Sequence, residues 1–352
     1  MTIEYKDSKR IVASGIGTEL NGIGGWKEVG RTTLGSADAN ILVSSLDDKR
    51  YYMILYADKG QASNGTDVNI RLNGDTGSNY SYRRCGNGGN DATDVSTATS
   101  YGIWAGNAVQ TPIFGVFYLS NKSDKEKLWQ GHAVTQHTAG AGNDPERSEL
   151  VTKWANTSNA VSSITANGTS NLTSGSEVVV LGWDTADTHT TNFWEELGST
   201  VLTTNTTGSW GVTSFTPKKY LWVQIWGYAS TDTQLRYGTG GSVDTGSNYA
   251  GRVSFNGGSD TLDPNATHTQ LGSFLNSNKG YANIFIINNS ANEKLSIMHS
   301  INAGTAGAGN YPSRTENVSK WTNTSGQIDT IKFEHSSATW YTGCTMKVWG
   351  SN

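Results

Sequence analysis

The segment TAGAGNDPERSELVTKWANTSNAVSSI, from Thr138 to Ile164, returns as TAGAGNYPSRTENVSKWTNTSGQIDTI, from Thr305 to Ile331. The two copies are identical at 16 of 27 positions without a gap, and they lie 167 residues apart. Chance does not produce a match that combines TAGAGN with KWxNTS at one spacing. The chain therefore contains an internal repeat, and the repeat decides how the rest is divided.

Shorter matched blocks extend the repeat outward in both directions. DTGSNY stands at 75–80 and at 244–249, and KEKLWQGHAV (125–134) matches NEKLSIMHSI (292–301). Runs of aromatic and β-branched residues with strand length also correspond, such as KRYYMILYA (49–57) and KKYLWVQIW (218–226), which read as central strands buried on both faces. The offset stays between 167 and 169 residues, so both copies should share one fold.

The repeat divides the chain into an N-terminal arm or anchor (1–25), repeat 1 (26–184), a linker (185–193) and repeat 2 (194–352). The arm has no counterpart and is expected to form a short strand on each side of the charged KDSKR. Each repeat holds roughly eight to ten strand-like segments and no helical periodicity. This pattern predicts an all-β chain of two tandem homologous antiparallel β-sandwiches of the jelly-roll type. A propeller or prism is the alternative, although two long copies do not suit a propeller of short blades.

Composition supports a β-rich globular chain. The length of 352 residues is enough for two cores, and the net charge of −4 gives no basic face for nucleic acid. Polarity comes from Gly, Asn, Ser and Thr, which are weak helix formers, while charged residues make up only 16%. The first residues lack an apolar segment of signal-peptide length, and no run approaches a membrane span, so membrane insertion is not expected.

The two cysteines occupy unrelated places in the repeat. Cys85 falls opposite Ser254, and Cys344 falls opposite Ser176. This predicts two mostly buried thiols without a disulfide, and it does not favour a zinc site, which needs more ligands.

Alternation sorts the residues of the repeated segment onto two faces of a strand. Charged side chains share one face, and the tryptophan lies on the other. The prediction is an ion-paired sheet face toward solvent or a neighbouring subunit, with the tryptophans as core anchors; a sugar- or partner-binding face is the alternative. The residues concerned are Arg147, Glu149, Lys153 and Trp154, and in the second copy Arg314, Glu316, Lys320 and Trp321.

Acidic and histidine residues that recur in both repeats are candidates for chemistry. Histidines His132 and His299 follow glutamates Glu126 and Glu293, but a catalytic dyad would also need a placed nucleophile or second carboxylate, so packed histidines are expected and no catalytic residue is predicted. The DTG of DTGSNY lacks the apolar strand context of an aspartic protease, and its aspartates are expected to be turn formers. Calcium is the only candidate cofactor, without a complete loop pattern, at Asp91, Asp94, Asp260 and Asp263.

The blocks TAGAGN, RSELVTKWANTS and DTGSNY resemble repeated β-domains in virion structural proteins of tailed phages and related viruses of marine microbes. The resemblance covers nearly all of 26–352. It implies a non-enzymatic decoration, fibre or tail-associated protein that forms homo-oligomers and contacts other virion proteins through its arm. It also implies a location on the virion, outside the cell after lysis, and allows a host glycan as a further partner.

Two other classes remain open from the sequence. A carbohydrate-binding module or lectin would need exposed aromatic platforms, and a glycan-degrading enzyme would need paired carboxylates, for which Glu126 and Glu293 are the candidates. The platform candidates are Trp104, Trp129, Trp210 and Trp222.

Overall fold

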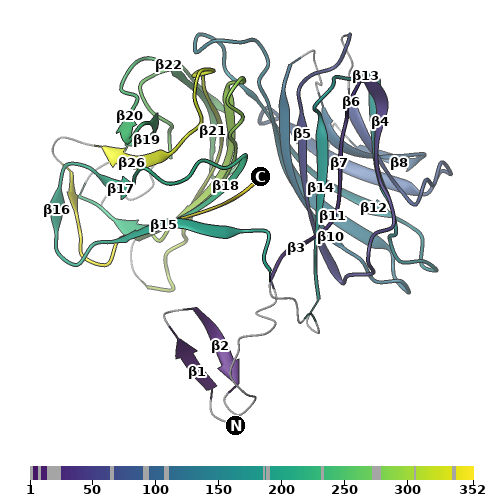
Figure 1. Ribbon diagram of the computed structural model, residues 1–352, viewed down its shortest axis with the longest axis horizontal. Coiled ribbons are helices and arrows are strands. Elements are labelled where there is room, and N and C mark those ends of the chain that lie inside the picture. Colours follow the sequence, from purple (N-terminus) through teal and green to yellow (C-terminus); the bar gives the residue numbers. More distant parts are fainter. Residues whose placement is uncertain are drawn as a thin grey trace.

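Strands form two sandwich-like halves joined in one chain (Figure 1). The computed structural model describes residues 3–6, 9–13, 25–63, 67–89, 95–106, 111–184, 187, 191–230, 234–271, 279–304, 307–334 and 338–352. Among these residues there is no helix long and apolar enough to cross a membrane. The predicted all-β fold of two antiparallel sandwiches is confirmed.

Repeat 1 consists of a large sheet of eight strands and a small sheet of four. In spatial order, the large sheet holds β3 (Lys27–Thr33), β14 (Glu177–Trp183), β5 (Tyr51–Asp58), β10 (Ile113–Ser120), β11 (Lys127–Thr135), β12 (Glu146–Trp154), β7 (Tyr80–Gly86) and β8 (Val95–Thr99). The small sheet holds β4 (Asp38–Val43), β13 (Ile164–Leu172), β6 (Asp67–Leu72) and β9 (Gly102–Gly106).

Repeat 2 has the same order in its large sheet, strand for strand. That sheet holds β15 (Glu195–Val201), β28 (Thr345–Ser351), β18 (Tyr220–Tyr228), β23 (Lys279–Ile287), β24 (Lys294–Asn302), β25 (Ser313–Trp321), β21 (Tyr249–Phe255) and β22 (Thr261–Ala266). The remaining strands are β17 (Trp210–Val212), β26 (Thr330–Glu334), β19 (Gln234–Thr239) and β20 (Ser242–Val243) in the small sheet, and the pair β16 (Thr206–Thr207) and β27 (Thr339–Trp340). In the N-terminal arm, β1 (Ile3–Lys6) pairs with β2 (Lys9–Ala13).

The tryptophan of the repeated segment anchors each sandwich core. Trp154 and Trp321 are each 1% exposed, and each stacks on a buried tyrosine of the neighbouring strand. The indole Nε1 of Trp154 donates to Asp75 Oδ2 at 2.7 Å, and that of Trp321 donates to Asp244 at 2.8 Å. These aspartates also accept backbone amides in their own turns, as predicted. The DTGSNY turn and the KWxNTS strand therefore recur together because one hydrogen bond joins them.

A buried lysine packs over the same tryptophan in each repeat. Lys127 Nζ donates to the carbonyls of Ser123, Lys125 and Asn156, and it lies 5.6 Å from the ring centroid of Trp154. Lys294 repeats the arrangement over Trp321. Three carbonyl partners and an aromatic face compensate the burial of the ammonium group.

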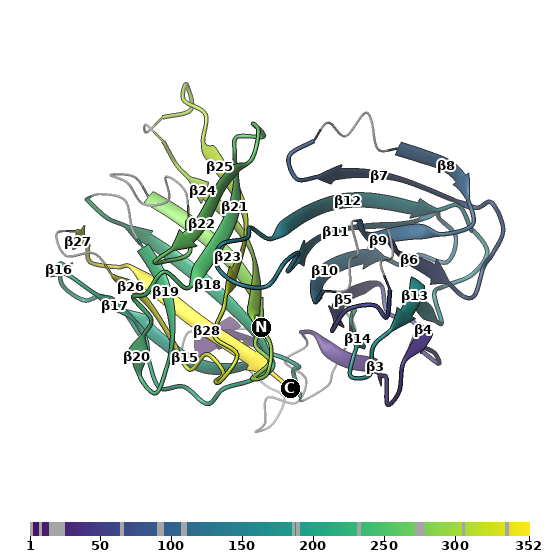
Figure 2. The ribbon, with the colours of Figure 1, turned by 90° about the horizontal axis from the view of Figure 1, so that it is seen from above.

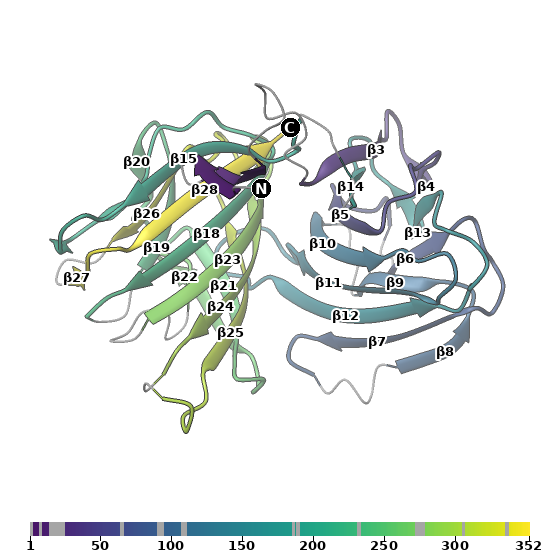
Figure 3. The ribbon, with the colours of Figure 1, turned by 90° about the horizontal axis from the view of Figure 1, so that it is seen from below.

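The outer faces of the two large sheets form a third hydrophobic core between the repeats. Alternate residues of β5 and β10 point away from their own sandwich, and they pack with residues of β18, β23 and β24. Figure 2 shows the connection between β11 and β12 reaching toward repeat 2, whereas Figure 3 shows the connection between β24 and β25 projecting away from repeat 1. Members of this core include Met53, Leu55, Phe114, Tyr220, Phe285, Leu295 and Ile297.

Candidate functional site

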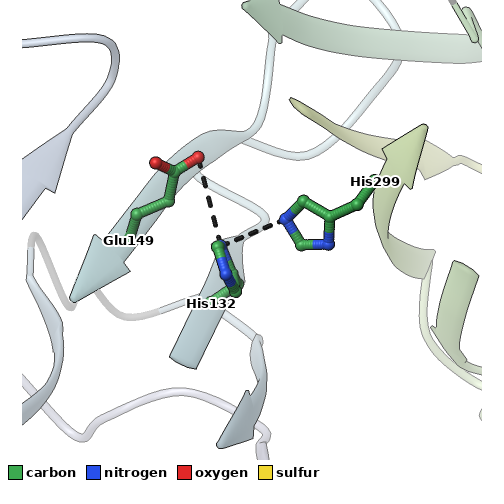
Figure 4. Close-up of side chains that lie close together, drawn as sticks. All are labelled: His132, Glu149 and His299. Carbon is green, nitrogen blue, oxygen red and sulfur yellow. Dashed lines mark hydrogen bonds and ion pairs between the residues drawn. The ribbon is translucent and has the colours of Figure 1, made fainter. Parts of the chain in front are cut away.

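Two equivalent histidines touch where the repeats meet (Figure 4). His132 lies on β11 and His299 on β24, and their ring centroids are 4.1 Å apart. His299 Nε2 and His132 Nδ1 are separated by 3.2 Å, so one nitrogen donates its proton to the other. The pair therefore lies in the contact between the repeats. Packed histidines are what the sequence predicts.

A buried arginine organises the charges around this pair. Arg147 has a side chain 4% exposed and contacts three carboxylates: Glu149 beside it, Asp260 at 2.7 Å and Glu316 at 3.5 Å. Asp260 and Glu316 belong to repeat 2, whereas Arg147 and Glu149 belong to repeat 1. Glu149 Oε1 also lies 4.0 Å from His132 Nδ1. The network is thus an ion-paired junction between the repeats.

Burial keeps both histidines neutral at neutral pH. It lowers the pKa of His132 to about 4, helped by the charge of Arg147. Burial and the neighbouring His132 lower the pKa of His299 to about 3. In the same network, burial and the charge of Glu149 raise the pKa of Glu316.

The cluster offers three ligand atoms to a metal ion. His132, Glu149 and His299 place one ligand atom each within 4.8 Å of one another, a spacing that suits zinc. However, the guanidinium of Arg147 already binds Glu149 and would oppose a divalent cation there. The arrangement suits a polar contact between sheets better than a metal centre.

Acid should weaken this junction. Histidine in the unfolded chain has a pKa near 6.5, so below that pH the unfolded chain binds more protons than the folded one. The stability that is present above pH 6.5 is therefore lost as the pH falls toward 4. Between pH 7 and pH 5, the free energy of unfolding should fall by about 1–2 kcal/mol less in the double variant His132→Gln/His299→Gln than in the wild type. This value allows for the partial exposure of the two rings to solvent. Urea unfolding at the two pH values measures this.

The exposed His137 provides the matched control. His137→Asn should leave the wild-type pH dependence unchanged, and asparagine suits the positive φ of 61° at this position. An unchanged pH dependence in the double variant would rule out the histidine pair as the source of acid sensitivity.

A groove of about 950 Å³ lies on the outer face of the large sheet of repeat 1, and neither His132 nor His299 is among its described lining residues. Leu128 and Val151 are 55% and 50% exposed there, and Tyr51 stacks on Trp183 with ring centroids 5.6 Å apart. Such an exposed apolar surface commonly marks a contact site. The groove is lined by residues that include Trp26, Tyr51, Arg83, Leu128, Val151 and Lys153.

The same surface of repeat 2 is covered. Leu295, Val318 and Lys320, the counterparts of Leu128, Val151 and Lys153, are at most 1% exposed. Leu295 and Val318 pack into the hydrophobic core between the repeats. The connection between β11 and β12 (residues 136–145, here the first turn) reaches Lys320, whose Nζ donates to the carbonyls of Gln136 and Thr138 in that turn. The two equivalent surfaces therefore differ, because only the surface of repeat 2 is covered by the other repeat and its turn.

The charged residues of the repeated strand lie in two different environments. Arg147, Glu316 and Lys320 are buried between the repeats, so for them the predicted exposure to solvent or another subunit is wrong; the neighbour is the other half of the same chain. Lys153 and Arg314 are 48% and 59% exposed in their side chains. Of the candidate glutamates, Glu126 pairs with Lys153 and Glu293 with Lys320.

The tryptophans predicted as exposed platforms do not lie on the surface. Trp104, Trp129 and Trp210 are 1%, 3% and 4% exposed, because they occupy inward positions of their strands. Trp222 is half-buried in the core between the repeats, where its Nε1 donates to Asn283 at 2.6 Å. The platform prediction is therefore wrong for these residues.

Asp260, a calcium candidate, is already paired. Its side chain is 2% exposed and bonds to Arg147 at 2.7 Å, so the carboxylate serves an ion pair. Asp263 donates its backbone amide to Asp144. The other two candidates, Asp91 and Asp94, lie outside the described residues.

The cysteines agree with their prediction in part. Both are thiols; Cys344 is buried and Cys85 is half-buried.

The groove itself was missed by sequence reasoning. Its apolar residues alternate with core residues along β11 and β12, and such alternation on both faces also fits a fully covered strand. No local signal separates a surface that a neighbour covers from one that stays open.

Comparisons with known proteins identify no family for this chain. No protein-family model matches the chain, and no curated protein matches it. Among solved structures, domains LG4-5 of the mouse laminin α1 chain align with 95% of this chain and 92% of their own, at 9% identity and a TM-score of 0.21. A similarity with so low a TM-score supports no statement about function.

Proposed function

We propose that this chain is a non-enzymatic assembly protein that acts through protein–protein contacts, as a structural component of a virion. The place of the repeated polar residues carries the proposal. His132, His299 and the network around Arg147 lie in the junction between the repeats, so the residues that repetition singles out serve architecture.

The groove of repeat 1 supports a role in contacts. It combines exposed apolar side chains, Leu128 and Val151, with aromatic rings and with polar groups such as Lys153 at its border. Apolar and aromatic centres with polar borders are typical of protein interfaces. The paired strands β1 and β2 provide a separate element through which the arm can dock onto other virion proteins.

The virion as the setting is drawn from the sequence resemblance. Mass spectrometry of density-purified particles, from a lysate of cells carrying this gene, tests it. We expect this chain in a fixed ratio to the major capsid or tail protein, and a chain lacking residues 1–24 should be lost from the particles. Recovery of the full chain only in the soluble fraction would contradict the proposal.

Glycan binding in the groove is the second candidate, favoured by the exposed Tyr51 stacked on Trp183. Aromatic faces of this kind can stack on sugar rings. Binding on a glycan array that disappears in Trp183→Ala and persists in Trp226→Ala, an exposed tryptophan of repeat 2, would favour it. Hydrolysis of a glycan that is abolished by Glu126→Gln with Glu293→Gln would instead indicate an enzyme.

A further inference from the structure

We propose that the groove of repeat 1 receives the TAGAGN turn of repeat 2 from a second copy of the chain, so that copies associate head to tail. The turn in question connects β24 to β25 (residues 303–312, here the second turn). Such an association deepens the assembly role, on which it rests, by naming one partner.

The contact inside one chain provides the template. The first turn lies on repeat 2, where Glu293 Oε1 accepts from the amide of Gly140 at 2.7 Å and Lys320 donates to two carbonyls of the turn. Arg252 Nε donates to the carbonyl of Pro145 at 2.9 Å. Carbonyls and amides of the turn are thus matched by charged side chains of the receiving surface. Leu295 on β24 and Val318 on β25 pack into the core between the repeats.

Repeat 1 keeps the receiving side chains without a turn on them. Lys153 and Glu126 are 48% and 43% exposed in their side chains and pair with each other at 3.4 Å. Leu128 and Val151 are about half exposed. The identities between the two receiving surfaces are Glu126 with Glu293, Leu128 with Leu295, Val151 with Val318, Lys153 with Lys320 and Arg83 with Arg252.

Repeat 2 keeps the matching turn, and the described residues 307–312 of this turn are exposed. TAGAGN is identical in both turns, and Pro312 corresponds to Pro145. Gly307, Ala308 and Gly309 are exposed, and Tyr311 is 86% exposed. Ile301, at the end of β24 beside this turn, is 52% exposed.

The turn and the charged and apolar residues that receive it are thus present a second time on the surface. By analogy with the first contact, Glu126 would accept from the amide of Gly307, and Arg83 would donate to the carbonyl of Pro312. Leu128 and Val151 would lose their exposure. The second contact differs from the first because Gln130 replaces Ile297 on the receiving surface, and because Ala303, Gly304 and Tyr311 replace Gln136, His137 and Asp144 in the turn.

A second copy fits the groove better than the same chain's own turn. The groove is lined by residues of repeat 1 alone, and the second turn projects away from repeat 1 (Figure 3). The two repeats are held by the Arg147 network and a shared hydrophobic core, which oppose rotation that would bring the turn closer. A contact between different surfaces can continue from copy to copy, giving a ring if it closes and a filament if it does not.

Sedimentation of the full chain across a concentration series tests the association. We expect wild-type mass to rise with concentration, and Val151→Asp, which places a charge in the contact, to weaken association at least about tenfold. Leu42→Asp is the matched control, because Leu42 is also 50% exposed but lies on the small sheet. A wild type that stays monomeric, or equal loss in both variants, overturns the proposal.

Mixing defective chains tests the pairing of groove with turn. Val151→Asp disrupts the groove but leaves the second turn intact, whereas Ala308→Asp disrupts the turn but leaves the groove intact. A mixture of the two variants retains one functional contact per pair of chains, so it should form dimers and nothing larger. Disulfide trapping of Leu128→Cys with Ala308→Cys, in a background with both native cysteines changed to serine, should link different chains. A link within one chain would show closure by the chain's own turn and overturn the proposal. A chain that is monomeric but present in virions would contradict the head-to-tail pairing and leave the proposed virion role standing.

Discussion

Replacing Arg147 with methionine should lower the free energy of unfolding by about 3–5 kcal/mol. The arginine is buried between the repeats and faces Glu149, Asp260 and Glu316. Methionine has a similar length but no charge, so Glu149 would lose its arginine partner. Asp260 and Glu316 would keep only Arg252 at 3.8 Å and Arg314 at 2.8 Å, respectively. Urea unfolding monitored by tryptophan fluorescence measures the loss.

The counterpart in repeat 2 makes the control unusually direct. Arg314 stands at the same position of the repeat, but its side chain is 59% exposed and its carboxylate partner is Glu316. Arg314→Met should therefore change stability by about 0.5 kcal/mol or less. Equal losses in the two variants would mean that the Arg147 network does not hold the repeats together.

Trp154→Ala should destabilise repeat 1 by about 3–5 kcal/mol. The ring is 1% exposed and stacks on Tyr80, and the substitution also leaves Asp75 without its indole donor. Lys127 would lose the ring beneath its ammonium group. Calorimetry should show an earlier transition for repeat 1.

Two further variants separate volume from hydrogen bonding at this position. Trp154→Phe keeps an aromatic ring but removes the donor to Asp75, so it should cost less than alanine. Trp226→Ala removes an indole that is 42% exposed, and about 1 kcal/mol or less is expected. A large loss in Trp226→Ala with a small one in Trp154→Ala would contradict the assignment of Trp154 as the core anchor.

Much of the fold follows from the sequence because strands have a period of two. The alternation around Arg147 and Trp154 placed these residues on opposite faces, and the structure agrees. The apolar run at 49–57 predicted a strand covered on both faces, and Met53 and Leu55 are buried against the other repeat. Local periodicity is enough to assign faces.

The candidate site could not be found in the same way. Lys153 and Lys320 occupy equivalent positions of the repeat, yet one is half exposed and the other is completely buried. The difference arises from how the two sandwiches meet, and contacts across more than 150 residues leave no trace in local pattern. Trp104 and Trp129 show the related error: aromatic content suggested platforms, but the parity of each strand turns them inward.

The two sides of the contact between the repeats are also synthesised one after the other. All strands of repeat 1 and its first turn lie within residues 27–183, so they leave the ribosome before repeat 2 is complete. Glu293 and Lys320 of repeat 2 then close on a turn that already exists. Synthesis from the N-terminus thus makes repeat 1 available as a surface against which repeat 2 folds.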